Sequence, residues 1–144
     1  MIVYTFAANP DADLPADYAG QITALYRSAG WWNEDTDNTA LIKSLVFGSY
    51  CFLVALEDDR IVGMGRVLSD GVSDAYIQDV TVRTDCRHRG IGGQIIRRLI
   101  ERLTHDSIRW IGLIAENNSH AFYQRLGFSI MPQAVPMLKT IDEA

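Results

Sequence analysis

The sequence predicts an α/β protein in which a mixed central β-sheet is flanked by helices. Two observations support this prediction. Apolar runs with the length of strands alternate with segments of helical periodicity along the chain. One amphipathic segment, 94–103, separates two of the apolar runs and so provides a crossover helix between strands. The chain has 144 residues, of which 48% are hydrophobic, so it can bury one core, and we expect a single domain over residues 1–144.

The N-terminal part of the chain is predicted to begin with a strand and a helix. Residues 2–6 form the apolar strand, and the proline-containing stretch 9–15 is a loop. Residues 16–29 have helical spacing, and Gly30 ends this helix. One face of the helix carries Tyr18, Ile22, Leu25 and Tyr26.

An aromatic and acidic segment follows this helix. Residues 31–38 read Trp-Trp-Asn-Glu-Asp-Thr-Asp-Asn. Asp37 or Asn38 can cap a second helix, which we expect over residues 39–47. Its inward-facing residues are predicted to be Leu41, Leu45 and Val46.

Two apolar strands, 51–56 and 60–68, form a predicted hairpin around the turn 57–59. Gly63 and Gly65 lie two residues apart in the second strand, so they leave one of its faces without side chains. This spacing indicates either a bulge or close packing against that face, or room for a substrate.

A glycine-containing loop, 87–93, joins the predicted strand 75–82 to the helix 94–103. Its sequence is Arg-His-Arg-Gly-Ile-Gly-Gly. Glycine lets backbone N–H groups approach a ligand closely, and the first turn of a helix has unpaired N–H groups with a partial positive charge. The loop therefore predicts a site for phosphate or pyrophosphate. The Lys and Ser/Thr of a P-loop and the third glycine of a dinucleotide-binding loop are both missing.

The C-terminal part is predicted to hold three further strands and one short helix. Residues 108–115 form an apolar strand, and their lack of alternation suits burial on both faces. Residues 116–119 are expected to cap a short helix that carries Tyr123. Residues 128–131 and 136–141 are the last two predicted strands.

Two motifs of the chain resemble those of the GCN5-related N-acetyltransferases, the GNAT superfamily. The first is Arg-x-x-Gly-x-Gly, spelled by Arg87, Gly90 and Gly92, which is similar to the family's acetyl-CoA pyrophosphate loop. The second, over residues 121–128, is similar to the family's aromatic-Tyr-x-x-x-Gly-Phe segment. The resemblance is good over residues 50–130. It implies a GNAT-like fold and direct transfer of an acetyl group from acetyl-CoA to a primary amine in a ternary complex.

The resemblance also implies which residues hold acetyl-CoA. The pantetheine arm would bond to the backbone of Val80, Thr81 and Val82. The pyrophosphate would bond to backbone N–H groups of His88, Arg89, Gly90, Ile91, Gly92 and Gly93. The Arg87 and Arg89 side chains either add charge near the phosphates or lie on a solvated surface. Asn117 or Asn118 would contact the CoA arm, and helix capping alone would also explain both.

Tyr123 is implied to lie beside the CoA sulfur, where it would bind the cosubstrate and act as the general acid. A phenol is protonated at neutral pH and can donate a proton to a departing thiolate. The alternative is a core tyrosine whose hydroxyl forms a hydrogen bond.

The general base of such enzymes often lies on the central strand, where Asp79 is the only carboxylate. Asp79 either takes this role or forms a structural hydrogen bond or salt bridge. A water chain, Glu34 or Asp35 could also serve as the base.

The acceptor site of the family borders the segment that matches Trp31, Trp32, Glu34 and Asp35. Two tryptophans also suit core packing. Aromatic rings beside acids suit a small cationic, aryl or alkyl amine, whose charge the acids would steer. A protein or peptide N-acetyltransferase and a non-catalytic module that binds acyl-CoA are the alternative functions.

Charge and cysteine content limit the expected partners. A net charge of −5 disfavours nucleic acid and is compatible with a cationic amine. No apolar run is long enough to span a membrane, and the N-terminus lacks the basic region of a secretory signal. Cys51 and Cys86 do not have metal-ligand spacing, so we expect no metal and a reduced, cytoplasmic setting. A homodimer is the oligomer that we consider.

Overall fold

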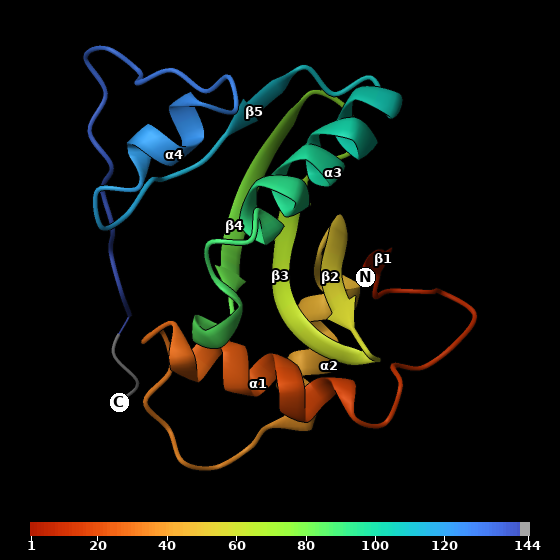
Figure 1. Cartoon of the computed structure of the whole chain (residues 1–144). Coiled ribbons are helices and arrows are strands. Elements are labelled where there is room, and N and C mark those ends of the chain that lie inside the picture. The colour runs from red at the N-terminus through yellow and green to blue at the C-terminus, as the bar shows by residue number, and fades with distance from the viewer. Residues whose placement is uncertain (142–144) are drawn as a thin grey trace. The chain divides into compact units, whose positions relative to one another are not determined.

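The structure is a computed structural model that describes residues 1–141 (Figure 1). Residues 1–113 form one unit, and the chain from Ile114 onward forms a second. The single domain expected over residues 1–144 stays a prediction.

The first unit is built on a mixed five-stranded sheet with the order β1-β2-β3-β4-β5. The strands are β1 (Ile2–Phe6), β2 (Cys51–Glu57), β3 (Arg60–Ser69), β4 (Asp74–Val82) and β5 (Trp110–Gly112). Neighbouring strands from β1 to β4 pair antiparallel, whereas β4 and β5 pair in parallel. The parallel pair requires a crossover, which α3 (Ile91–His105) provides. This arrangement confirms the predicted fold class.

The other helices lie close to their predicted positions. They are α1 (Tyr18–Ser28), α2 (Thr39–Gly48), the 3₁₀-helix η1 (Thr84–Cys86) and, in the second unit, α4 (His120–Gln124). Asn38 caps α2, because its side chain accepts a hydrogen bond from the Leu41 N–H at 3.0 Å. Helix α3 begins at Ile91, three residues before the predicted start, so Gly92 and Gly93 belong to its first turn.

Helices α1 and α2 pack on one face of the sheet. Their buried side chains form a core with apolar residues of β2 and β3; these include Ile22, Leu25, Ile42, Val46, Phe52, Val54 and Met64. The prediction that Leu41 faces inward is wrong, since Leu41 is 43% exposed and the adjacent Ile42 is fully buried. A difference of one residue rotates the buried stripe by about 100° around a helix.

Helix α3 covers the opposite face of the sheet, and the two glycines of β3 explain how closely it approaches. A Cβ atom on Gly63 would lie 3.0 Å from Cδ1 of Ile95. Gly65 is in equally close contact with the same helix. Close packing is therefore the reason for these glycines, and the face that they leave bare is filled by α3 rather than by a substrate.

Strand β4 contains a bulge next to Gly65. Met64 pairs with Thr81 and Arg66 with Gln78, so two residues of β4 lie opposite one residue of β3. One of the two bulged residues, Asp79, has a positive φ of 58°. The bulge turns the strand immediately before the segment 80–82.

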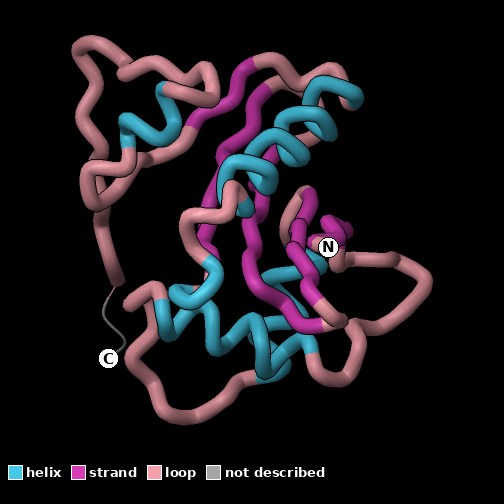
Figure 2. The backbone as a smooth tube through the Cα atoms, in the orientation of Figure 1, coloured by secondary structure: helices cyan, strands magenta, loops and turns pink. Residues whose placement is uncertain are grey.

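The second unit contains less regular structure than the sequence predicted (Figure 2). Residues 128–131 and 136–141 form no strand, and the strand predicted over 108–115 is limited to β5. Six large apolar side chains in this part of the chain are between 58% and 90% exposed: Ile130, Met131, Val135, Met137, Leu138 and Ile141. An apolar pattern favours an extended conformation, but a strand also needs a neighbour that accepts its backbone hydrogen bonds, and the pattern does not supply one.

Among the described helices, none combines the length and the apolar character that crossing a membrane would require.

Candidate functional site

The glycine loop leads from the end of β4 into the first turn of α3. His88 and Gly90 both have positive φ angles, of 64° and 79°, and Gly90 is the N-cap of α3. Apart from Gly90 and its two chain neighbours, no atom of the described residues lies within 4 Å of the position that a Cβ on Gly90 would occupy. The N–H groups of the first helical turn have no partner within the helix and carry a partial positive charge. The loop therefore has the backbone geometry that suits an anionic group, and its role as a phosphate site stays a prediction.

The two arginines of the loop are held by their own chain. Arg89 forms a two-bond ion pair with Glu57, in which Nη1 lies 3.1 Å from Oε1. The hydrogen bond from Arg89 lowers the pKa of Glu57. Arg87 donates from Nε to the backbone oxygen of Val82 at 3.3 Å. Both side chains are exposed, so either could reach a phosphate only by giving up or sharing these contacts.

One edge of β4 is open where the pantetheine arm was predicted to bind. On one side, Thr81 and Val82 pair with β3. On the other side, β5 pairs only with residues 74–76 of β4. Within the first unit, backbone groups of residues 80–82 therefore lack a strand partner on the β5 side. Such an edge can pair with an extended ligand that carries amide groups.

Asp79 belongs to a largely buried cluster of polar side chains. Its Oδ2 atom accepts a hydrogen bond from the Tyr26 hydroxyl at 2.6 Å and another from Arg66 Nε at 2.7 Å. The Arg66 and Asp79 side chains are only 12% and 16% exposed. The structural salt bridge that the sequence suggested as the alternative to a general base is thus present.

Sequence reasoning missed the two partners of Asp79. Tyr26 was assigned to a packed helix face, and Arg66 received no role. A signal for Arg66 was available, because it is the only charged residue between Ile61 and Leu68 in an apolar strand. A lone charge in such a strand requires a partner of opposite charge.

The two tryptophans of the predicted acceptor segment differ in their packing. Trp32 stacks on Tyr26, with 4.2 Å between ring centroids and 7° between planes, and it packs against the core. Trp31 meets the edge of Tyr26 at 5.9 Å and is 39% exposed. Core packing thus accounts for Trp32, and Trp31 offers a ring to a ligand.

The two acids that follow are exposed. The backbone oxygen of Glu34 accepts a hydrogen bond from Arg27 Nε at 2.9 Å, which anchors the segment to α1. The side chains of Glu34 and Asp35 form no hydrogen bond or ion pair within residues 1–141 and can meet a cation.

Tyr123 lies in α4 of the second unit, between two phenylalanines. Its ring contacts Phe122 at 5.0 Å and Phe128 at 5.9 Å, both edge to face. Among the described residues, its hydroxyl forms no hydrogen bond, so the alternative of a bonded core tyrosine is not supported. Burial, and then the nearby charge of Glu116, raise the pKa of Tyr123. The phenol is therefore protonated at neutral pH and free to donate.

Asn117 and Asn118 precede α4, and both have positive φ angles, of 54° and 60°. The N-cap of α4 is Ser119, within the segment 116–119 that was expected to cap it, so the alternative that capping explains both asparagines is not supported. Asparagine tolerates the left-handed region better than most residues, which explains the residue type but assigns no ligand to either side chain.

Within residues 1–141, no three or more His, Cys, Asp or Glu side chains form a group that could hold a metal. Cys51 and Cys86 are buried and form no disulfide. Burial raises the pKa of the Cys51 thiol to about 11.

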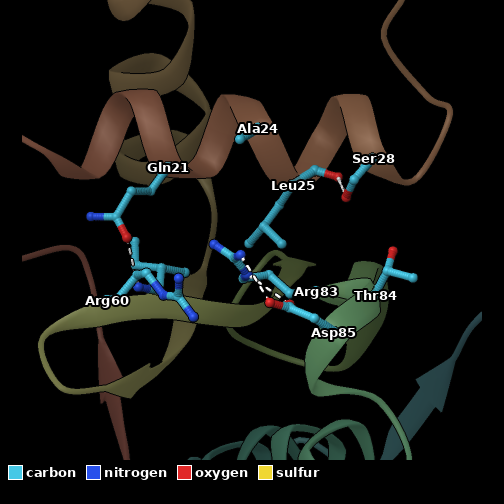
Figure 3. A pocket seen from close by; sticks show the side chains of 9 residues that line it. Gln21, Ala24, Leu25, Ser28, Arg60, Arg83, Thr84 and Asp85 are labelled. Carbon is cyan, nitrogen blue, oxygen red and sulfur yellow. Dashed lines mark hydrogen bonds and ion pairs between the residues drawn. The ribbon is translucent and has the colours of Figure 1, made fainter.

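A pocket of about 470 Å³ lies between α1 and the segment that follows β4 (Figure 3). Its lining residues are Gln21, Ala24, Leu25, Ser28, Arg60, Ile61, Arg83, Thr84 and Asp85. Arg83 is paired with Asp85 there, with Nε 3.1 Å from Oδ1. None of the residues predicted to bind acetyl-CoA or the acceptor lines this pocket, and we assign it no part in the transfer.

Comparison with known proteins shows the family of the chain. The model of the Acetyltransferase (GNAT) family matches residues 18–128, which is most of the chain. The chain belongs to the GNAT family. This confirms the resemblance seen in its motifs.

Two curated plant proteins are among the relatives of this GNAT protein. Serotonin N-acetyltransferase 2, chloroplastic, of Oryza sativa subsp. japonica is 36% identical over 76 residues, covering 53% of this chain and 38% of the rice protein. Histone acetyltransferase TAP1 of Glycine max is 35% identical over 79 residues, covering 55% of this chain and 34% of the soybean protein. The matched part spans less than half the length of each relative.

Solved structures share the fold over nearly the whole chain. A probable acetyltransferase of Staphylococcus aureus has a TM-score of 0.77 and 21% identity, covering 98% of this chain and all of that one. A predicted acetyltransferase of Clostridium acetobutylicum, solved with acetyl-CoA, has a TM-score of 0.71 and 16% identity, covering 96% of both chains. An aminoglycoside acetyltransferase from a soil metagenomic sample, solved with sisomicin, has a TM-score of 0.75 and 22% identity, covering 98% and 97% of the chains.

Proposed function

We propose that this GNAT protein transfers the acetyl group of acetyl-CoA directly to the primary amine of a small cationic, aryl or alkyl molecule. The observation that carries the proposal is the open edge of β4 at residues 80–82, which continues through the loop to the N-terminus of α3. One continuous stretch of chain thus offers backbone groups for an amide-containing arm and then N–H groups for an anion.

The residues at these positions suit acetyl-CoA. Val80, Thr81 and Val82 would hold the pantetheine arm through their backbones, and the N–H groups from His88 to Gly93 would hold the pyrophosphate. The open space at Gly90 leaves room for the phosphates. Of the two loop arginines, Arg87 is the better candidate for a phosphate contact, because Arg89 is committed to Glu57. Asn117 or Asn118 would contact the CoA arm.

The transfer forms a bond between the amine nitrogen and the thioester carbon and breaks the bond between that carbon and sulfur. We assign Tyr123 as the acid that protonates the departing thiolate. Its hydroxyl forms no hydrogen bond among the described residues, and its raised pKa keeps the phenol protonated at neutral pH.

The attacking amine must also lose a proton. Asp79 was the predicted base, but the two hydrogen bonds on its Oδ2 favour the structural alternative. We propose instead that solvent water, together with the exposed carboxylates Glu34 and Asp35, accepts this proton.

The acceptor is proposed to be a small amine because aromatic and acidic residues adjoin one another over residues 31–35. The exposed ring of Trp31 can contact an apolar or cationic group, and the carboxylates of Glu34 and Asp35 favour an ammonium group. The rice relative is named for serotonin and the metagenomic enzyme for aminoglycosides, and both are small amines. The soybean relative is named for histones, which favours a protein acceptor as the second candidate.

Thiol release tests the proposal. Purified protein would be incubated with acetyl-CoA and, separately, with arylalkylamines, polyamines, aminoglycosides and lysine-containing peptides. We expect thiol release with at least one small amine and none without an acceptor. Release with peptides alone would favour the second candidate. Binding of acetyl-CoA without release under any condition would indicate a non-catalytic module.

A homodimer is part of the proposal. The apolar side chains of residues 130–141 are exposed, so each copy has apolar surface to cover. Light scattering with size-exclusion chromatography should give twice the monomer mass, and Leu138→Glu should reduce it. A monomer at all concentrations would contradict this.

A cytoplasmic location is also part of the proposal, and the two unpaired, buried cysteines are compatible with it. The rice relative and a GCN5-related N-acetyltransferase of Arabidopsis thaliana both carry chloroplastic names, so a fluorescent fusion in the source cell would test the compartment.

A further inference from the structure

Three side chains from three different elements meet at the β4 bulge. Tyr26 comes from α1, Arg66 from β3 and Asp79 from the bulge itself. Oδ2 of Asp79 accepts a hydrogen bond from each of the other two, at 2.6 Å and 2.7 Å. The Arg66 guanidinium also donates to Gln78 Oε1 at 3.3 Å and to Ser49 Oγ, at the C-terminal end of α2, at 3.4 Å. The cluster therefore connects both N-terminal helices to β4.

The backbone of Asp79 needs this support. Its φ of 58° lies in the left-handed region, which residues other than glycine adopt at a cost in energy. Such a conformation persists only where the surroundings determine it. The two hydrogen bonds to the Asp79 carboxylate hold the residue in this conformation. The next residues, 80–82, are those proposed to bind the pantetheine arm.

Tyr26 extends the cluster to the acceptor segment. Its hydroxyl bonds to Asp79, one face of its ring stacks on Trp32, and Trp31 lies at its edge. The rigid ring of Tyr26 thus connects both tryptophans to the carboxylate of the bulge residue.

We infer that Tyr26, Asp79 and Arg66 are positioning residues that hold the β4 bulge and couple the acceptor segment to the strand that binds acetyl-CoA. The inference rests on the proposed function, because it names residues that orient the two substrates of the same reaction. None of the three acts on the reacting atoms. They set the direction of residues 80–82 relative to residues 31 and 32, and thus the alignment of thioester and amine.

The chain contains a second cluster in which a tyrosine hydroxyl and an arginine both bond to one aspartate oxygen. It serves as a matched control. The Tyr50 hydroxyl donates to Asp106 Oδ2 at 2.5 Å, and Arg102 Nε donates to the same oxygen at 2.8 Å. This cluster joins the start of β2 to the C-terminal end of α3, and it contacts neither the bulge nor the acceptor segment.

The test compares Tyr26→Phe with Tyr50→Phe, since each change removes one hydroxyl from one cluster and keeps the ring. Steady-state kinetics would give kcat and the KM of each substrate. We expect Tyr26→Phe to lower kcat by roughly tenfold to a hundredfold, the cost of a small misplacement of reacting groups, and to raise the KM of the amine. Tyr50→Phe should leave all three constants within about twofold of wild type. Equal effects of the two changes, or none from Tyr26→Phe, would overturn the inference.

Asp79→Asn and Arg66→Lys distinguish positioning from catalysis. If Asp79 were the base, Asp79→Asn would remove the acidic limb of the plot of kcat/KM against pH, whereas Arg66→Lys would not. For a positioning cluster, both variants should lose activity to a similar extent while the pH profile keeps its shape. Loss of the acidic limb in Asp79→Asn alone would overturn the inference. Circular dichroism would select variants that melt like wild type.

A failure of the proposed function would give a different result from a failure of this inference. A wild-type protein that binds acetyl-CoA but releases no thiol with any amine would refute the transfer itself. The cluster would then be tested by calorimetry with acetyl-CoA, where Tyr26→Phe should weaken binding and Tyr50→Phe should not. Unchanged affinity in Tyr26→Phe would overturn the inference in that case also.

Discussion

Gly65 of β3 and Ile95 of α3 are in such close contact that a Cβ atom on Gly65 would lie 2.9 Å from Cγ2 of Ile95. The branched side chain of Ile95 is fully buried and has little freedom to move. The same Cβ would lie 3.2 Å from Val80 Cγ2 and 3.3 Å from Leu99 Cδ1. The glycine thus determines how closely α3 approaches the sheet next to the β4 bulge.

This contact predicts that Gly65→Ala is destabilising. Overpacking of a filled core costs about 1–3 kcal/mol, and we expect a loss of stability in this range from chemical denaturation. Gly20→Ala is the matched control, because Gly20 is exposed in α1 and, outside its chain neighbours and the adjacent helix backbone, no atom of the described residues lies within 4 Å of its Cβ position. There the same change should stabilise by about 0.5–1 kcal/mol. A Gly65→Ala protein as stable as wild type would contradict the close packing.

Substitution of Gly92 should affect ligand binding rather than folding. Gly92 lies in the first turn of α3, where backbone N–H groups would face the pyrophosphate. We expect Gly92→Val to abolish measurable binding of acetyl-CoA in calorimetry while the protein still melts cooperatively. Wild-type affinity in a folded Gly92→Val protein would exclude this loop as the phosphate site.

The two tryptophans should respond differently to replacement by alanine. Trp32 stacks on Tyr26 and packs on the core, so Trp32→Ala should cost stability as well as raise the KM of the amine. Trp31 is partly exposed, so Trp31→Ala should raise the KM of the amine with little loss of stability. Melting temperatures and KM values for both substrates would be measured together. An unchanged amine KM in Trp31→Ala would remove this segment from the acceptor site.

Tyr123→Phe should lower kcat and leave the affinity for acetyl-CoA nearly unchanged, since only the proton donor is lost. Positioned acids contribute about 10²–10⁴-fold, and a thiolate leaves readily, so we expect an effect at the lower end. The pKa of Tyr123 is raised, so the active, protonated form is lost only as pH rises above about 10. Deprotonation of Tyr123 should therefore cause no fall in kcat below that pH. A kcat within about twofold of wild type, with chemistry rate-limiting, would reduce Tyr123 to packing.

The control cluster predicts a dependence of stability on pH. The hydrogen bond from Tyr50 is the largest cause that lowers the pKa of Asp106, followed by those from His105 and Arg102. A carboxyl whose pKa is lower in the folded state stabilises the fold above its unfolded value of about 3.9 and loses this contribution as pH falls below it. Between pH 7 and pH 3, the free energy of unfolding measured in urea should therefore fall more for wild type than for Tyr50→Phe. Equal drops would argue against the hydrogen bond.

Much of the fold could be predicted from the sequence because its signals are local. Helical spacing located α1 and α2 to within two residues, and apolar runs located β2 and β3. The glycine loop was recognisable as a candidate anion site because residue type, backbone conformation and helix start are linked over a few neighbours. The loop and the segment 121–128 were also sufficient to indicate the family that the comparison then established.

Only the tertiary structure showed which side chains bond to Asp79 and whether the last predicted strands form. Asp79 meets Tyr26 and Arg66, residues 53 and 13 positions away, and no local pattern records which side chains the fold brings together. The segments 128–131 and 136–141 have the composition of strands, but strands are defined by pairing with a neighbour. The sequence alone therefore determined where most helices and strands lie, because composition, spacing and turn chemistry are local. Side-chain partners and strand pairing depend on contacts between distant parts of the chain, and these exist only after folding.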